Sequence, residues 1–247
     1  MNILFDYKLC TFNCVYCEIG KTEREHLVSA DHKVDLPPEV AFRKELISVL
    51  KHFPHLDSIS FSGYYGEPTL NIHLEEYLHI ARKIRDRRKW EGSKPKLTLF
   101  TNSSTLHKEK IRNVAGQFDV VLAKLDAATE DDFLRTVRPH KSIPSVEKII
   151  ASIVKLRSKM PQGNELILQC LLYSSYRDDF QSNANKRNIE ALADAINKIK
   201  PDGVQIYSIA RAPAEYYVYA LDKSRLEQIA IKLKKLTNLK KLDIIHY

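Results

Sequence analysis

Short apolar runs alternate with longer amphipathic segments along most of the 247 residues. The apolar runs have the length and composition of buried strands and cover 2–8, 57–62, 97–101, 118–125, 165–173 and 203–209. The segments with helical periodicity cover 38–52, 72–89, 105–115, 144–159, 184–199 and 222–236. This alternation predicts parallel strands with right-handed crossovers, in either an open doubly wound α/β sheet or a full or partial (β/α) barrel. In both architectures ligands bind at the carboxyl ends of the strands.

The composition is typical of one globular domain. A hydrophobic content of 44% can bury one sizeable core, and no Gly-, Ser- or Pro-rich linker divides the chain, so we expect residues 1–247 to form a single domain. No apolar run approaches the roughly 20 residues that cross a bilayer, and Asp6 and Lys8 interrupt the opening run as no signal peptide would allow. We therefore expect a cytoplasmic protein with no membrane partner. Its net charge of +8 suits an anionic partner such as nucleic acid.

Three of the four cysteines form a C-x3-C-x2-C array directly after the first predicted strand. In a reducing compartment such a group indicates a metal site rather than disulfides. Thiolates from Cys10, Cys14 and Cys17 can bind three irons of a cubane cluster and leave the fourth iron open for a small chelating ligand. The alternative is a structural zinc ion bound by the same cysteines and His26, in a nucleic-acid-binding protein without catalysis.

The cysteine spacing, with Tyr16 just before the last cysteine, is similar to the signature of the radical S-adenosylmethionine superfamily. The resemblance continues after the second predicted strand, where residues 62–69 read SGYYGEPT. This segment resembles the family's Gly-Gly-Glu-Pro element, with Tyr65 in place of the first of the adjacent glycines. After the third predicted strand, Thr101-Asn102-Ser103 resembles the family's Thr-Asn-Gly element.

Later segments resemble the wyosine-synthase-related group of iron–sulfur oxidoreductases within that superfamily. They are LDAA at 125–128 with Phe133 and RPH at 138–140, then VQI at 204–206 and RAPAE at 211–215. Altogether the resemblance runs from about residue 2 to residue 235. Wyosine synthases proper carry further cysteines upstream for a second cluster, whereas nine residues precede Cys10 here, so the resemblance does not carry over their reaction on transfer RNA.

The resemblance implies a partial (β/α)6 TIM-like barrel and two cofactors, a [4Fe–4S] cluster and S-adenosyl-L-methionine. A one-electron donor such as a ferredoxin or flavodoxin would reduce the cluster, which passes the electron to the cofactor and breaks its carbon–sulfur bond. The 5′-deoxyadenosyl radical would then abstract hydrogen from a substrate. The substrate classes that this implies are an RNA base, a glycine of a partner enzyme, and a small metabolite or cofactor precursor.

The same resemblance assigns cofactor contacts to nine residues: Tyr16, Gly66, Glu67, Pro68, Thr101, Asn102, Asp126, Arg138 and Arg211. It places Glu67 against the methionine ammonium, while Asn102 or Asp126 can hydrogen-bond the ribose and Tyr16 can lie beside the adenine. The two arginines can bind the cofactor carboxylate or a substrate phosphate. Each residue also has a structural alternative. The polar residues can cap turns or helices, the arginines can form surface ion pairs, and the tyrosine can pack in the core.

Cys170 and Lys124 have no role in these motifs. Cys170 lies inside an apolar strand run, where it is either a small buried hydrophobe or a thiol in the barrel lumen that donates hydrogen to a radical. Lys124 precedes Asp126 by two residues and can therefore face the same side of its strand, toward the interior. The basic runs at 82–89 and 232–241 are interpreted as solvated helix faces, with phosphate binding as the alternative.

Overall fold

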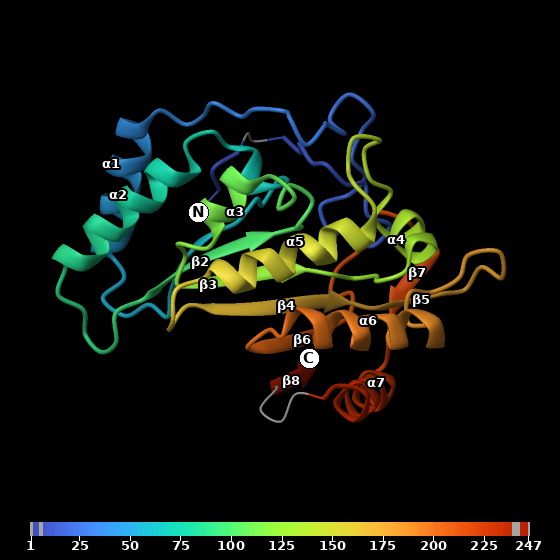
Figure 1. Cartoon of the computed structure of the whole chain (residues 1–247). Helices are drawn as coiled ribbons and strands as arrows, with labels where there is room; N and C mark the ends of the chain where they lie inside the picture. The colour runs from blue at the N-terminus through green and yellow to red at the C-terminus, as the bar shows by residue number, and fades with distance from the viewer. Residues whose placement is uncertain (1, 5–6, 239–242, 247) are drawn as a thin grey trace.

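A six-stranded parallel sheet is the centre of the computed structural model, which describes residues 2–4, 7–238 and 243–246 (Figure 1). Its strands are hydrogen-bonded in the order β1-β2-β3-β4-β6-β8, and each neighbouring pair is parallel. Their bounds are β1 Ser58–Phe61, β2 Lys96–Thr101, β3 Val120–Lys124, β4 Glu165–Leu171, β6 Gly203–Tyr207 and β8 Asp243–His246. Because all six strands run in one direction, their carboxyl ends meet at the same edge of the sheet.

Helices connect the strands, and Figure 1 shows α5 and α6 lying across the central strands. The helices are α1 Glu39–Lys51, η1 Pro68–Leu70, α2 Leu74–Arg87, α3 Glu109–Ala115, α4 Glu130–Val137, α5 Val146–Lys159, α6 Lys186–Ile199 and α7 Lys223–Leu236. Four of them begin at N-cap side chains that accept a backbone N–H three residues on, which stabilises each helix start by about 1 kcal/mol. These caps are Thr129, Ser145, Asn185 and Asp222. No helix of the described residues has the length and apolarity needed to cross a membrane.

The two faces of the sheet differ in character because side chains alternate along each strand. On β4, Leu166, Leu168 and Cys170 are buried in the main core, which also contains residues of α2, α5 and α6. Fully burying a leucine stabilises the fold by roughly 1.5–3 kcal/mol. On the opposite face Gln169 donates to the side chain of Gln205 on β6 at 2.8 Å. Helices outside and a polar inner face confirm the predicted α/β class, a partial (β/α)6 barrel.

The predicted strand at 2–8 is wrong for the residues described there. Asn2 and Leu9 make isolated parallel bridges to Ser62 and Gly66, and residues 5–6 lie outside the described part. The described residues of this segment therefore make two separate bridges to the turn after β1 and are not assigned to a strand. The sixth strand of the sheet is β8, which pairs with β6. Helix α4 was also absent from the predicted elements.

The predicted strand 165–173 is divided between two sheets. After Leu171 the chain leaves β4, and Tyr173–Ser175 forms β5, which pairs antiparallel with β7, Val218–Ala220. This two-stranded sheet lies at the carboxyl ends of the parallel strands (Figure 1). Tyr173 and Val218 pack in a small cluster with Tyr16, so the two-stranded sheet supports the segment that carries the cysteines.

Candidate active site

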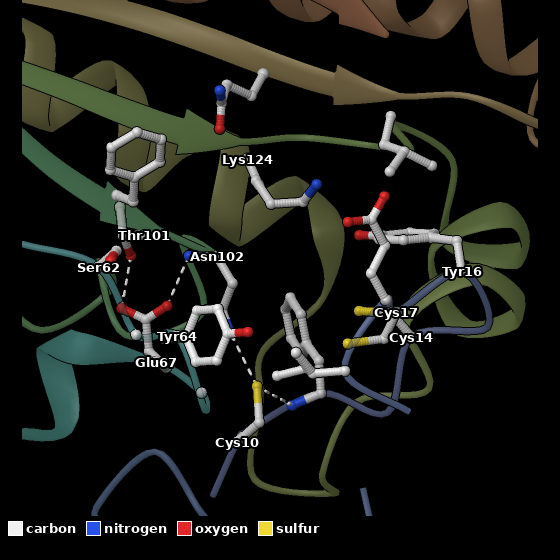
Figure 2. A pocket seen from close by; sticks show the side chains of 18 of the residues that line it. Cys10, Cys14, Tyr16, Cys17, Ser62, Tyr64, Glu67, Thr101, Asn102 and Lys124 are labelled. Carbon is white, nitrogen blue, oxygen red and sulfur yellow. Dashed lines mark hydrogen bonds between the residues drawn. The ribbon is translucent and has the colours of Figure 1, made fainter. Parts of the chain in front are cut away.

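A pocket of about 520 Å³ lies at the carboxyl ends of the parallel strands (Figure 2). Its walls come from the cysteine loop, residues 10–17, from the turn after β1, and from the ends of β2, β3, β4 and β6. The three clustered cysteines line it, as do seven of the nine predicted cofactor residues: Tyr16, Gly66, Glu67, Pro68, Thr101, Asn102 and Arg211. The other two do not line it: Asp126 is buried, and Arg138 is a partly exposed partner of Glu215.

Backbone hydrogen bonds hold the cysteine loop in place although it belongs to no helix or strand. The N–H of Leu9, just before the loop, donates to the carbonyl of Tyr65 at 2.7 Å. Within the loop, the N–H of Val15 donates to the carbonyl of Thr136 at the end of α4 at 3.0 Å. The loop is therefore fixed between the turn after β1 and α4.

The thiols of Cys10, Cys14 and Cys17 are free and half-buried, and Figure 2 shows the last two close together, across from the first. Burial raises the pKa of Cys10 to about 11, and burial also raises the pKa of Cys14. Such thiols give up their protons when a metal binds, because the thiolate is the ligand. Three soft donors around one pocket fit an iron–sulfur cluster, in which each thiolate binds a different iron.

The zinc alternative required His26 to join the three cysteines around one ion. The ring of His26 instead packs against Tyr7, with ring centres 4.9 Å apart. Among residues 2–4, 7–238 and 243–246, no three Cys, His, Asp or Glu side chains are grouped as ligands of a single ion. The side-chain arrangement gives the zinc site no support.

The turn after β1 depends on two glycines, because the backbone approaches closely there. A Cβ at Gly66 would lie 1.7 Å from the carbonyl oxygen of Leu9, and one at Gly63 would lie 2.0 Å from that of Gly66. The N–H of Gly66 donates to the carbonyl of Gly63 at 2.9 Å and closes the turn. The turn can thus pack directly on the chain that enters the cysteine loop.

Glu67 is fully buried and links the turn after β1 to the end of β2. Its Oε1 accepts the hydroxyls of Thr69 at 2.5 Å and Thr101 at 2.8 Å, and its Oε2 accepts the backbone N–H of Asn102 at 2.6 Å. Burial raises its pKa, although these hydrogen bonds act in the opposite direction. Glu67 also caps η1 by accepting the N–H of Thr69 at 3.2 Å. The alternative role considered from the sequence, capping a turn or helix, therefore describes part of what Glu67 does.

Asn102 contacts both the turn and the cysteine loop. Its side-chain amide donates to the hydroxyl of Thr11 at 2.9 Å and lies 3.6 Å from the sulfur of Cys10. Its Oδ1 accepts the N–H of Ser104 at 3.0 Å in a local turn. Because α3 begins only at Glu109, Asn102 does not cap that helix.

Tyr16 and Asp126 form one buried unit. The hydroxyl of Tyr16 donates to Oδ2 of Asp126, and the other oxygen of this carboxylate accepts the N–H of Leu171 at 2.7 Å. The Asp126 carboxylate thus holds the Tyr16 ring at the edge of the pocket and does not itself line it. Nor does Asp126 cap α4, whose N-cap is Thr129.

The two predicted arginines have different surroundings. Arg138 pairs with Glu215 and donates to the hydroxyl of Tyr217 at 2.7 Å, which ties the end of α4 to the segment before β7. Arg211 lines the mouth of the pocket, with its Nε 3.9 Å from the carboxylate of Glu18. Only Arg211 has its guanidinium where a ligand in the pocket can reach it.

The family model for the radical SAM superfamily matches residues 5–173, more than half of the chain. The chain belongs to the radical SAM superfamily. Enzymes of this superfamily use a [4Fe–4S] cluster and S-adenosylmethionine, the two cofactors predicted from the sequence.

Curated relatives of this radical SAM chain extend beyond it. It is 28% identical over 223 residues to "GTPase Obg" of Brachyspira hyodysenteriae, covering 90% of this chain and 29% of that protein. It is 26% identical to "UPF0026 protein MJ1312" of Methanocaldococcus jannaschii, in a match that covers 85% of this chain and 59% of that protein. For "UPF0026 protein slr1464" of Synechocystis the identity is 30%, covering 80% and 64%. The chain therefore spans less than two thirds of the length of each of these relatives.

Two solved structures share the fold. Streptococcus suis SuiB bound to S-adenosylmethionine has a TM-score of 0.65 and 13% identity, covering 99% of this chain and 49% of that one. The structure of anSMEcpe with bound AdoMet has a TM-score of 0.61 and 16% identity, covering 93% and 58%. At these identities the likeness concerns the fold alone.

Cys170 faces the core of this radical SAM fold. It is fully buried among the leucines of β4 and does not line the pocket. Burial strongly raises the pKa of its thiol. Its position agrees with the small-hydrophobe interpretation.

Several pocket residues carried no predicted role. Lys8 donates to the carbonyl of Gly20, and its Nζ lies 3.2 Å from the sulfur of Cys17. Tyr207 and Gln169 face the pocket from β6 and β4. Tyr207 lies near the carboxyl end of the predicted strand 203–209, which was its only available signal, whereas Gln169 lies in the middle of the predicted strand 165–173 and had none.

Proposed function

We propose that this chain is a radical S-adenosylmethionine enzyme that binds a [4Fe–4S] cluster through Cys10, Cys14 and Cys17. The observation that carries the proposal is one pocket in which three half-buried thiols share the walls with Glu67 and Asn102. Its volume of about 520 Å³ suits a small-molecule cofactor, since such sites span roughly 300–1,000 Å³. We further propose that residues 1–247 form a single radical SAM domain.

The pocket residues would bind and orient S-adenosylmethionine. Within the described part of the chain, Oε2 of Glu67 accepts a single hydrogen bond, from Asn102, so it can accept another from the methionine ammonium. Arg211 at the pocket mouth would bind a carboxylate. Gly66 and Pro68 would shape the wall beside the methionine, and Thr101 would hold Glu67 in place.

Other residues would contribute by position. Tyr16 would offer its ring to the adenine while Asp126 fixes its hydroxyl. Arg138 would not contact the cofactor and would support the pocket indirectly, by joining α4 to the segment before β7. The side chains of Phe100 and Leu171 add apolar surface that excludes water from the pocket.

A cluster held by Cys10, Cys14 and Cys17 would supply the electron for cleavage of S-adenosylmethionine, and so the radical chemistry of hydrogen abstraction from the substrate. A cytoplasmic donor such as a ferredoxin or flavodoxin would provide that electron. The substrate would be an RNA base, a glycine of a partner enzyme, or a small metabolite or cofactor precursor. The pocket is lined by the cationic side chains of Lys8 and Lys124 and by the apolar side chain of Phe100, so its lining is compatible with any of these substrate classes.

The test is anaerobic reconstitution with iron and sulfide, followed by metal analysis and a cleavage assay. We expect a brown protein with about four irons per chain that forms 5′-deoxyadenosine when dithionite and S-adenosylmethionine are added. A colourless protein with one bound zinc and no 5′-deoxyadenosine would contradict the proposal and favour the zinc-stabilised nucleic-acid-binding protein.

A further inference from the structure

The inner wall of the pocket carries a lysine for which the proposed cofactor contacts have no use. Lys124 is the last residue of β3, and Figure 2 shows its side chain reaching into the pocket above Asn102, with its nitrogen toward Tyr16. The side chain is 22% exposed. Its Nζ lies 4.9 Å from the ring centre of Tyr16 and 5.1 Å from that of Tyr207. Two aromatic rings therefore hold the ammonium at the pocket wall.

The ammonium of Lys124 has more donors than its neighbours use. An ammonium carries three N–H groups, and one donates to the hydroxyl of Tyr207 at 2.8 Å. Oδ1 of Asp126 lies 3.3 Å from Nζ, but that oxygen also accepts the N–H of Leu171 at 2.7 Å. Even if Asp126 takes a second N–H, the described residues leave a third N–H of Lys124 for a ligand.

The hydroxyl of Tyr207 adds a second donor at the same place. Its oxygen accepts from Lys124, which leaves the phenolic proton to be donated elsewhere. No side chain or backbone group of the described residues accepts that proton. Two donors 2.8 Å apart, one of them cationic, match two oxygens of one carboxylate or phosphate group.

The two acids near this site have hydrogen-bond partners of their own, and Asp126 is also within ion-pair distance of Lys124. Asp126 is bound by Tyr16 and Leu171, while Oε1 of Glu18 accepts the N–H groups of Ala210 and Arg211 at 3.1 and 3.2 Å. Burial would lower the pKa of Lys124, but the charge of Asp126 and the Tyr207 hydroxyl raise it above its ordinary value. The amine therefore stays a cation and does not become a nucleophile.

We propose that Lys124 and Tyr207 bind an anionic oxygen group of the substrate, a carboxylate or a phosphate. The inference rests on the proposed function, because it assigns the substrate to the pocket that holds the cofactor. It narrows the substrate to molecules that carry such a group near the hydrogen to be abstracted.

The test measures small anions bound to the reconstituted full-length chain in the presence of S-adenosylmethionine. Saturation-transfer NMR compares propionate with its neutral isostere propionamide, and inorganic phosphate is added as a competitor to identify the preferred anion. We expect at least about a tenfold preference for propionate over propionamide, because a hydrogen bond to a charged group is typically worth that factor or more. Lys124→Met should abolish the preference, Lys124→Arg should restore part of it, and Tyr207→Phe should weaken propionate binding several-fold.

Lys110→Met, on the exposed surface of α3, is the matched control and should behave as wild type. Equal binding of propionate and propionamide to wild type would overturn the inference, as would an unchanged preference in Lys124→Met. Tyr207→Phe leaves no buried charge unpaired, so it tests the site even if Lys124→Met fails to fold. Each sample is also assayed for 5′-deoxyadenosine, and loss of that product in wild type would count against the proposed function instead.

Discussion

The backbone N–H of Asn102 donates to Oε2 of Glu67 at 2.6 Å, across 35 residues of sequence. This bond joins the turn after β1 to the end of β2. Asn102 in turn contacts Thr11 and Cys10, so the Glu67 carboxylate is connected to the cysteine loop through a single residue. A change at Glu67 is therefore expected to disturb the turn after β1 and the end of β2 together, which is where the cofactor would bind.

Glu67→Gln should weaken S-adenosylmethionine binding by roughly ten- to a hundredfold while the cluster still assembles. The variant loses one charge-assisted hydrogen bond, worth about 1.5–3 kcal/mol, and must set an amide N–H against the N–H of Asn102 or Thr69. Calorimetric titration of the reconstituted protein measures the affinity, and iron analysis provides the control. Wild-type affinity with normal iron content would show that Glu67 is only a turn residue.

Gly66→Ala should destabilise the fold by about 3 kcal/mol, because the new Cβ would lie 1.7 Å from the carbonyl oxygen of Leu9. Gly163→Ala is the matched control, since its Cβ meets nothing within 4 Å although its φ of +93° is also unfavourable for alanine. Denaturant unfolding compares the two variants. Equal losses of unfolding free energy would mean that Gly66 is required for its backbone conformation and not for the close approach to Leu9.

Cys170→Ala should leave iron and sulfide content unchanged. The thiol lies on the core face of β4, away from the pocket, and its replacement should cost about 1 kcal/mol of stability through lost packing. Iron analysis and paramagnetic resonance of the reduced protein check this. Loss of the cluster signal in a folded variant would identify Cys170 as a fourth ligand and favour an electron carrier.

His73 should make the stability depend on pH above neutrality. Its hydrogen bond to Asp35 raises its pKa above 6.5, so its stabilising effect is complete below about pH 6.5 and is lost as the pH rises through the folded value. With a third of the side chain exposed, the effect should stay below about 1 kcal/mol. Between pH 6 and pH 9 the free energy of unfolding, measured with denaturant, should fall more for wild type than for His73→Gln. Equal decreases in the two proteins would contradict this.

The strand–helix alternation predicted the centre of the sheet because buried parallel strands are continuously apolar. It failed for β8, a four-residue strand at Asp243–His246, and for the segment before Cys10, whose pairing is with a turn. Helix α4 was missed although Thr129 and the acids that follow it form a regular helix start.

The cysteine array and the Gly-Glu-Pro element were recognisable because their chemistry is local in sequence. By contrast, nothing local indicates that Lys124 meets Tyr207, 83 residues away, since that contact depends on the positions of β3 and β6 in the sheet. Likewise, a ribose contact or a helix cap was predicted for Asp126, but no local pattern predicted that Tyr16 and Leu171 hydrogen-bond its carboxylate or that Nζ of Lys124 lies 3.3 Å from it.

The most direct test of the proposed cluster site is the cleavage of S-adenosylmethionine by Cys14→Ala beside wild type, after identical anaerobic reconstitution. Each thiolate should be the sole protein ligand of its iron, so the variant should lose the [4Fe–4S] resonance signal and form no 5′-deoxyadenosine above background, while wild type does both. Full iron loading with wild-type 5′-deoxyadenosine formation in Cys14→Ala would show that Cys14 is not a cluster ligand.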